Sequence, residues 1–101
     1  MIYAVRLGHA AERDIDELID YLVPRAGEAV TRAYLGRLQA FLKKFETFPM
    51  RGTVRSDTRD GLRVIGFERS LTIAFVVEAE TVHILRILTR GRELHLYDDE
   101  Q

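Results

Sequence analysis

The pattern of hydrophobic and polar residues changes period early in the chain. Tyr3, Val5 and Leu7 alternate with other residues and share one face of an extended segment, which predicts a first strand over residues 2–7. From about residue 10 the apolar residues recur every three or four positions, which is typical of an amphipathic helix. The chain therefore opens with a strand followed by a helix.

A second helical pattern follows a short break. We expect Pro24 and Gly27 to end the first helix, because proline lacks an N–H group and glycine favours helix ends. Pro49 closes the second pattern, so the two segments predict an antiparallel helical hairpin with a turn of a few residues. Gly36 interrupts this pattern, either on the solvent side or where the two helices approach closely. The apolar stripe of the second helix consists of Val30, Ala33, Tyr34, Leu38, Phe41, Leu42, Phe45 and Phe48.

Three further strands are predicted after an aperiodic loop over residues 50–61. The first two strands alternate, and they are followed by a third that is apolar on both faces except for His83 and Arg86. A strand that is apolar on both faces belongs inside a sheet. The order of strand, helical hairpin and three-stranded antiparallel meander predicts an α+β domain with the hairpin on one sheet face.

Composition limits the chain to one small domain. Its 101 residues predict a single domain over residues 1–97 and an acidic tail over residues 98–101. There is no cysteine, and the three histidines lack metal-ligand spacing, so we expect no disulfide and no metal site. No apolar run approaches the ~20 residues of a membrane span, which favours a cytoplasmic protein without membrane partners.

Charge points to a contact surface. The formal net charge is −1, which argues against direct binding of DNA by charge alone. All but two of the 15 basic residues are arginines, whose planar guanidinium groups suit carboxylates, phosphates and aromatic faces. We therefore expect arginines to carry recognition of a partner.

Individual residues also recur at characteristic spacings over nearly the whole chain. The first helix carries Ala11, Asp14, Ile15, Leu18 and Tyr21. The second helix and the residues after it carry Tyr34, Leu38, Leu42, Phe45, Pro49 and Gly52. The meander and terminal segment carry Gly61-Leu62-Arg63, Thr72-Ile73-Ala74-Phe75, the run from Val82 to Leu88, and Gly91-Arg92-Glu93-Leu94. In their order and spacing these residues resemble the RelE/ParE toxins of bacterial type II toxin–antitoxin systems.

The resemblance covers two chemistries. RelE-like members cleave mRNA in the ribosomal A site with basic residues, whereas ParE-like members inhibit DNA gyrase by binding. In RelE-like enzymes a Tyr-Arg pair opens the middle strand of the meander, and lysines precede it; here Ser70 and Leu71 match the pair, and Val64, Ile65 and Gly66 stand where the lysines are expected. An arginine also stays protonated at neutral pH and is a poor general base. The ParE branch therefore fits better.

The resemblance implies the toxin of a plasmid-stabilisation system that inhibits DNA gyrase without catalytic residues or cofactors. It also implies a ParD-like antitoxin whose disordered C-terminal segment folds onto the toxin. A RelE-like ribosome-dependent mRNA endonuclease and a non-toxic interaction module are the alternatives. His83, His95 and Tyr97 are the remaining proton acceptors for the endonuclease reading.

Two sets of residues follow from this interpretation. The candidates for target binding are Arg63, Arg86, Arg90 and Arg92. The candidates for antitoxin binding, beside an apolar groove along the hairpin, are Arg6, Arg13, Tyr21 and Tyr34. Without the resemblance, Arg63 and Arg86 would be assigned to ion pairs on the sheet surface, with Asp60, Glu68 or Glu93 as partners.

Overall fold

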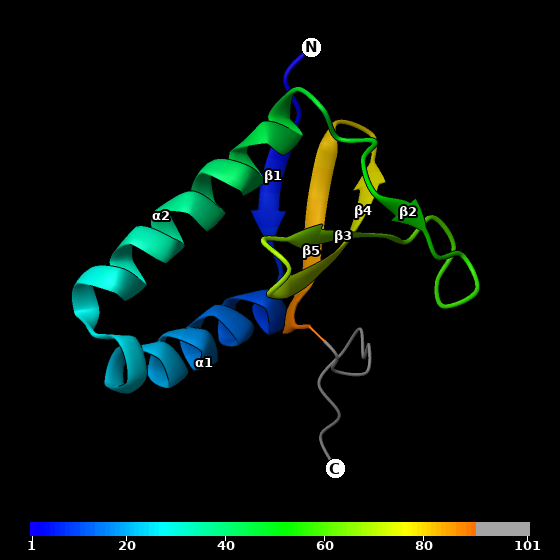
Figure 1. Cartoon of the computed structure of the whole chain (residues 1–101). Coiled ribbons are helices and arrows are strands. Elements are labelled where there is room, and N and C mark those ends of the chain that lie inside the picture. Colours follow the sequence, from blue (N-terminus) through cyan, green and yellow to red (C-terminus); the bar gives the residue numbers. More distant parts are fainter. Residues whose placement is uncertain (91–101) are drawn as a thin grey trace.

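Two helices cover one face of a mixed sheet, as Figure 1 shows. The computed structural model describes residues 1–90. Its elements are β1 (Ala4–Leu7), α1 (His9–Ala26), α2 (Glu28–Lys43), a 3₁₀ turn η1 (Lys44–Glu46), β2 (Thr53–Val54), β3 (Arg63–Phe67), β4 (Leu71–Glu78) and β5 (Thr81–Thr89).

The strands form one sheet in the order β1-β5-β4-β3-β2. β1 runs parallel to β5, and the other neighbours are antiparallel. The α+β prediction and the inner position of the last strand are thus confirmed. The prediction of an aperiodic loop over residues 50–61 is wrong at β2, because a two-residue strand is too short to show a period. Gly52 permits this pairing, since a Cβ there would lie 2.2 Å from the Val64 carbonyl oxygen.

The joint between the two helices is a single residue. Gly27 has φ 90° and ψ 163°, a backbone conformation open essentially to glycine alone. The predicted turn of a few residues is therefore wrong. The prediction that Pro24 and Gly27 end the first helix is confirmed for Gly27, which directly follows α1, and wrong for Pro24, which lies inside its last turn. Around Pro24, Arg25 Nη1 donates to the Tyr21 carbonyl at 2.8 Å and the Gly27 amide donates to the Val23 carbonyl at 2.9 Å.

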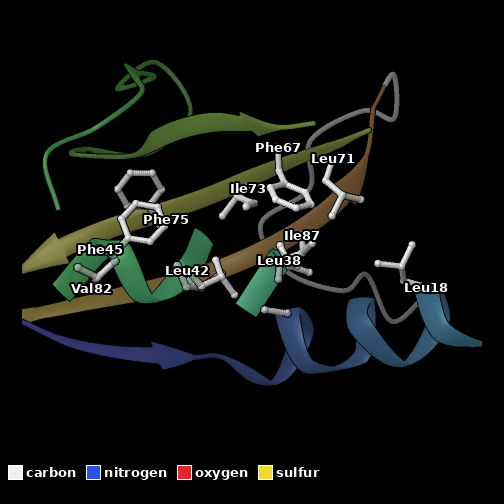
Figure 2. Packing of buried hydrophobic residues seen from close by; sticks show 12 residues of the cluster. Leu18, Leu38, Leu42, Phe45, Phe67, Leu71, Ile73, Phe75, Val82 and Ile87 are labelled. Atoms are coloured by element: carbon white, nitrogen blue, oxygen red, sulfur yellow. The ribbon is translucent and has the colours of Figure 1, made fainter. Parts of the chain in front are cut away.

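The core lies between the helical hairpin and the sheet, and Figure 2 shows part of it. Leu38, Leu42 and Phe45 of the predicted stripe are buried, and Phe41 is half-buried. Other members of the stripe, Val30, Ala33 and Phe48, are exposed. The prediction failed for Phe48 because the α-helix ends at Lys43 and the chain leaves its axis through η1. The buried cluster consists of Ala11, Leu18, Leu38, Leu42, Phe45, Phe67, Leu71, Ile73, Phe75, Val82, Ile84 and Ile87.

Two glycines should respond to alanine in opposite directions. Gly27→Ala places a Cβ in a strained conformation and should lower the free energy of unfolding by about 1–3 kcal/mol. Gly36→Ala should raise it by about 0.5–1 kcal/mol, because Gly36 lies inside α2 with open space where the Cβ would stand. Urea unfolding of both variants measures the difference. Equal effects of the same sign would contradict the assignment of Gly27 as the joint.

The two neighbouring phenylalanines of the second helical pattern should differ in their contribution to stability. Phe45 is fully buried and its ring centroid lies 4.6 Å from that of Phe75, so Phe45→Ala should cost about 3–5 kcal/mol. Phe41→Ala should cost less, because one side of Phe41 is open. Chemical denaturation of the two variants tests this order, and a larger loss for Phe41 would contradict it.

Candidate functional site at the end of strand β5

Among residues 1–90, no strand pairs with the second half of β5 on its outer edge. β1 pairs with β5 only from Ala4 opposite Thr81 to Leu7 opposite Ile84, and the Gly8 amide donates the last bond of this pairing to the Ile84 carbonyl at 3.0 Å. β5 then continues to Thr89. Helix α1 begins at this point and crosses the open edge, so a helix closes the sheet where β1 ends.

Asp14 of α1 closes this edge. Its carboxylate accepts two bonds from the Arg86 guanidinium, from Nε at 2.8 Å and from the terminal nitrogen Nη2 at 2.9 Å. The same carboxylate accepts the Ile87 amide hydrogen at 2.8 Å. Both charged side chains are buried, at about 5% exposure. A carboxylate in the helix thus serves as hydrogen-bond partner for both a strand side chain and the strand backbone.

An irregularity in β5 orients these groups. Ala74 pairs with Arg86 and Phe75 pairs with Ile84, so Leu85 is an extra residue without a partner in β4. Ala74 lies between Ile73 and Phe75, which both face the helices, so the Ala74 side chain points to the opposite face of the sheet. Arg86 is paired with Ala74, and its side chain leaves the strand on the same face. The Arg86 guanidinium then reaches Asp14 at the edge of the sheet.

The prediction that Arg86 lies on the sheet surface is therefore wrong. Its guanidinium pairs with Asp14, which is 72 residues away along the chain, too far for a local pattern to indicate the pair. The sequence does place Asp14 on the apolar side of α1, between Ala11 and Leu18, and this position indicates that its carboxylate is buried. A carboxylate on the buried side of a helix requires a partner.

A cavity of about 390 Å³ lies next to this ion pair. It is open to solvent and mostly apolar, with two carboxylates on the α1 side. Its lining residues are Asp14, Glu17, Leu18, Tyr21, Leu71, Ile87 and Thr89.

The structure does not bring the candidate target-binding arginines together. Arg90 is exposed in the turn after β5, where its amide donates to the Ser70 carbonyl at 2.8 Å. Arg63 pairs with Phe75, which lies four residues along β4 from Leu71, the partner of Thr89, and this spacing corresponds to about 13 Å. Arg63 is half-buried and donates to the Arg51 carbonyl at 3.3 Å. Arg86 is buried, and Arg92 lies outside the described residues, as do His95 and Tyr97.

The candidate antitoxin-binding residues also lie on different surfaces. Arg6 is exposed on β1 and points to the face opposite the helices, since Val5 and Leu7 pack on the core. Arg13 and Tyr21 are exposed on α1, and Arg25 lies 3.9 Å above the Tyr21 ring. Tyr34 is half-buried, and its hydroxyl lies 2.6 Å from the Ser70 hydroxyl. Tyr34 therefore contributes to packing between α2 and the sheet.

A shallow groove between α2 and the turn after β3 was not anticipated from the sequence. Phe41 and Phe67 form its apolar floor, and its lining residues are Arg37, Ala40, Phe41, Lys44, Phe67 and Glu68. Arg37 donates two hydrogen bonds to Glu68, at 2.7 and 3.1 Å, which lower the pKa of Glu68 below its ordinary value. The groove thus combines aromatic surface with two cations, Arg37 and Lys44, and the carboxylate of Glu68.

The two histidines within residues 1–90 lie in different parts of the fold. His83 lies 3.7 Å from Glu78 near the β4–β5 turn, and His9 lies 3.8 Å from Glu12 at the start of α1. Within residues 1–90, no three acidic or histidine side chains are grouped so that they could hold a metal ion. In the same part of the chain, neither helix is long and apolar enough to cross a membrane.

Comparison with known proteins places these features in a family. The family model described as the ParE toxin of the type II toxin–antitoxin system parDE matches residues 5–94. Toxin ParE3 of Caulobacter vibrioides is 32% identical over 75 residues, which is 74% of each chain.

Two solved structures have the same fold. A chromosomal ParDE toxin–antitoxin system from P. aeruginosa superposes with a TM-score of 0.75 at 21% identity, over 87% of this chain and 96% of that chain. The RelBE2 toxin–antitoxin complex from Mycobacterium tuberculosis gives a TM-score of 0.63 at 22% identity, over 91% and 95% of the two chains.

The buried carboxylate should be essential for stability. Asp14→Ala leaves the Arg86 guanidinium without the Asp14 carboxylate and the Ile87 amide without its acceptor, and it should cost about 3–5 kcal/mol. Asp16→Ala in the same helix is the matched control, because Asp16 is exposed, and it should change stability by less than about 1 kcal/mol. Thermal and chemical unfolding measure both. Equal losses of unfolding free energy in the two variants would contradict a particular role of Asp14 in stability.

Proposed function

The chain belongs to the ParE toxin family of type II toxin–antitoxin systems, and we propose that it inhibits DNA gyrase by binding it, without catalysis of its own. We further propose that a ParD-like antitoxin neutralises it. Both activities follow the ParE branch of the family, which the residue pattern of the meander favours over the RelE branch.

The observation that carries this proposal is the environment of Ser70 and Leu71. These residues stand where RelE-like enzymes have a Tyr-Arg pair for the scissile phosphate. Leu71 is buried at 2% exposure, and Ser70 is held between the Tyr34 hydroxyl and the Phe67 carbonyl. Both positions contribute to the core and its edge, so they offer no cation to a phosphate.

The preceding strand supports the same conclusion. Val64, Ile65 and Gly66 of β3 carry no charge, although lysines are typical of this region in RelE-like enzymes. Cleavage of RNA by attack of the 2′-hydroxyl requires a proton acceptor and cations around the phosphate. The groups that could supply them in residues 1–90, such as His83 and Arg63, lie in separate surroundings.

The target-binding surface is best assigned to the segment that begins at Arg90. Arg90 is exposed and stands directly after β5, and Arg92 follows two residues later. Guanidinium groups frequently anchor protein interfaces, because they can pair with carboxylates and stack on aromatic rings. Arg86 is not a contact residue in this proposal, since its guanidinium is buried against Asp14.

The antitoxin is best assigned to the helical side of the molecule. The similar proteins from P. aeruginosa and M. tuberculosis belong to toxin–antitoxin systems. The groove at Phe41 and Phe67 has a basic rim at Arg37 and Lys44, which suits an acidic amphipathic segment that folds on binding. Among the residues proposed from the sequence, Arg13 and Tyr21 remain exposed on α1 of the hairpin, outside the lining of this groove. Both partners would place the toxin in the cytoplasm.

Gyrase inhibition can be measured directly with purified protein. We expect the protein to inhibit supercoiling while mRNA in a programmed ribosome stays intact. Replacing Arg90 and Arg92 together by Ala should weaken inhibition by about thirtyfold, the loss expected when an anchor worth about 2 kcal/mol is removed. Arg32→Ala, an exposed arginine on α2, is the matched control and should inhibit like the wild type. Codon-specific mRNA cleavage with normal supercoiling would establish the RelE chemistry instead.

Growth assays complete this test. Expression of the toxin alone should arrest growth, and co-expression of its antitoxin should restore it. The Arg90 and Arg92 variant should lose toxicity and still bind the antitoxin, because the proposed docking groove lies on the helical side. Normal growth at confirmed expression of folded wild-type protein would favour a non-toxic interaction module.

A further inference from the structure

We propose that Asp14 is a positioning residue for the target-binding segment. By accepting the Ile87 amide hydrogen, Asp14 fixes the end of β5 and thereby the place at which Arg90 leaves the sheet. This inference rests on the proposed function, in which the segment from Arg90 contacts the target.

The end of β5 is held from both edges. On the inner edge, Thr89 pairs with Leu71, and the Arg90 amide donates to the Ser70 carbonyl at 2.8 Å. On the outer edge β1 has already ended, and the bond from the Ile87 amide to Asp14 at 2.8 Å takes the place of a strand. Arg90 follows Ile87 by three residues. Within residues 1–90, loss of the outer bond would leave the exit point held at the inner edge alone.

The extra residue in β5 makes this bond possible. The Ile84 carbonyl points toward β1, since it accepts the Gly8 amide. In a regular strand, alternate residues direct their backbone groups to the same edge, so Arg86 and not Ile87 would present its amide there. Leu85 adds one residue between these positions and turns the Ile87 amide outward to Asp14. The irregular strand and the buried carboxylate are therefore parts of one arrangement.

A contribution to folding stability alone does not explain why Asp14 and Arg86 are charged. A buried ion pair can often be replaced by apolar residues of similar volume without loss of stability, because burial removes both charges from water. Leu and Met could fill the space of Asp14 and Arg86, but neither could accept the Ile87 amide hydrogen. The choice of residue at position 14 therefore separates two roles of Asp14, which are filling space in the interior and accepting the Ile87 amide hydrogen.

Two double variants make this separation. D14N/R86M removes both charges but keeps a side-chain carbonyl that can accept the Ile87 amide. D14L/R86M also removes both charges and leaves that amide without an acceptor. The two proteins differ only in the residue at position 14, so a role of the charges in stability affects both equally. Thermal unfolding and binding of the antitoxin identify folded protein in each case.

The experiment measures amide exchange at Ile87 and Arg90 and inhibition of gyrase supercoiling. We expect exchange of these amides to stay slow in D14N/R86M and to become fast in folded D14L/R86M. The concentration of toxin for half-inhibition should remain within about threefold of the wild type in D14N/R86M and rise by about tenfold or more in D14L/R86M, as for a misplaced interface anchor. Equal exchange and equal inhibition by the two variants would overturn the inference.

Amide exchange tests the role of Asp14 even if the proposed function is wrong. If the wild-type toxin does not inhibit gyrase, amide exchange still decides whether Asp14 holds the end of β5. Slow exchange in the wild type and in D14N/R86M, with fast exchange in D14L/R86M, would then support the positioning role of Asp14. Fast exchange at Ile87 in the wild type would overturn it, whatever the target is.

Discussion

The difference in length between two paired strands shapes the rest of this structure. β1 has 4 residues and β5 has 9, so the outer edge of β5 extends well beyond its strand neighbour. A buried backbone amide without a partner is costly, and the edge has to be closed. Helix α1 starts immediately after β1 and provides Asp14 as acceptor. The first helix, the sheet edge and the exit of the chain toward Arg90 therefore form one connected unit.

Apolar burial and directional hydrogen bonds contribute to the fold in different ways. The apolar cluster between the hairpin and the sheet supplies most of the driving force, but burial of apolar surface has no direction. The bonds from Arg86 and Ile87 to Asp14 are directional and fix where α1 crosses β5. Gly27 then turns the chain within one residue, so that α2 returns along the same face of the sheet. Together these features determine how the hairpin is placed on the sheet.

The two proposed partner surfaces adjoin each other at the turn after β3. The groove at Phe41 and Phe67 is formed by α2 and the end of β3, and Glu68 on its rim also lines a pocket beside Arg90, which follows β5. In the function proposed above, the groove binds the antitoxin and the segment that begins at Arg90 contacts the target. The family assignment, the burial of Leu71 and the half-buried position of Ser70 are the grounds on which we propose binding, and not RNA cleavage, as the mode of action.

The sequence by itself determined the order and type of the main elements, since alternation and helical periodicity report directly on which residues face a core. It also indicated the family and the burial of Leu38, Leu42 and Phe45. Only the tertiary structure decided the role of Arg86. Its partner Asp14 lies 72 residues away, and a local pattern cannot show which distant groups meet. The short strand β2 and the extra residue Leu85 were also decided by pairing across the sheet, because both depend on hydrogen bonds to a neighbouring strand.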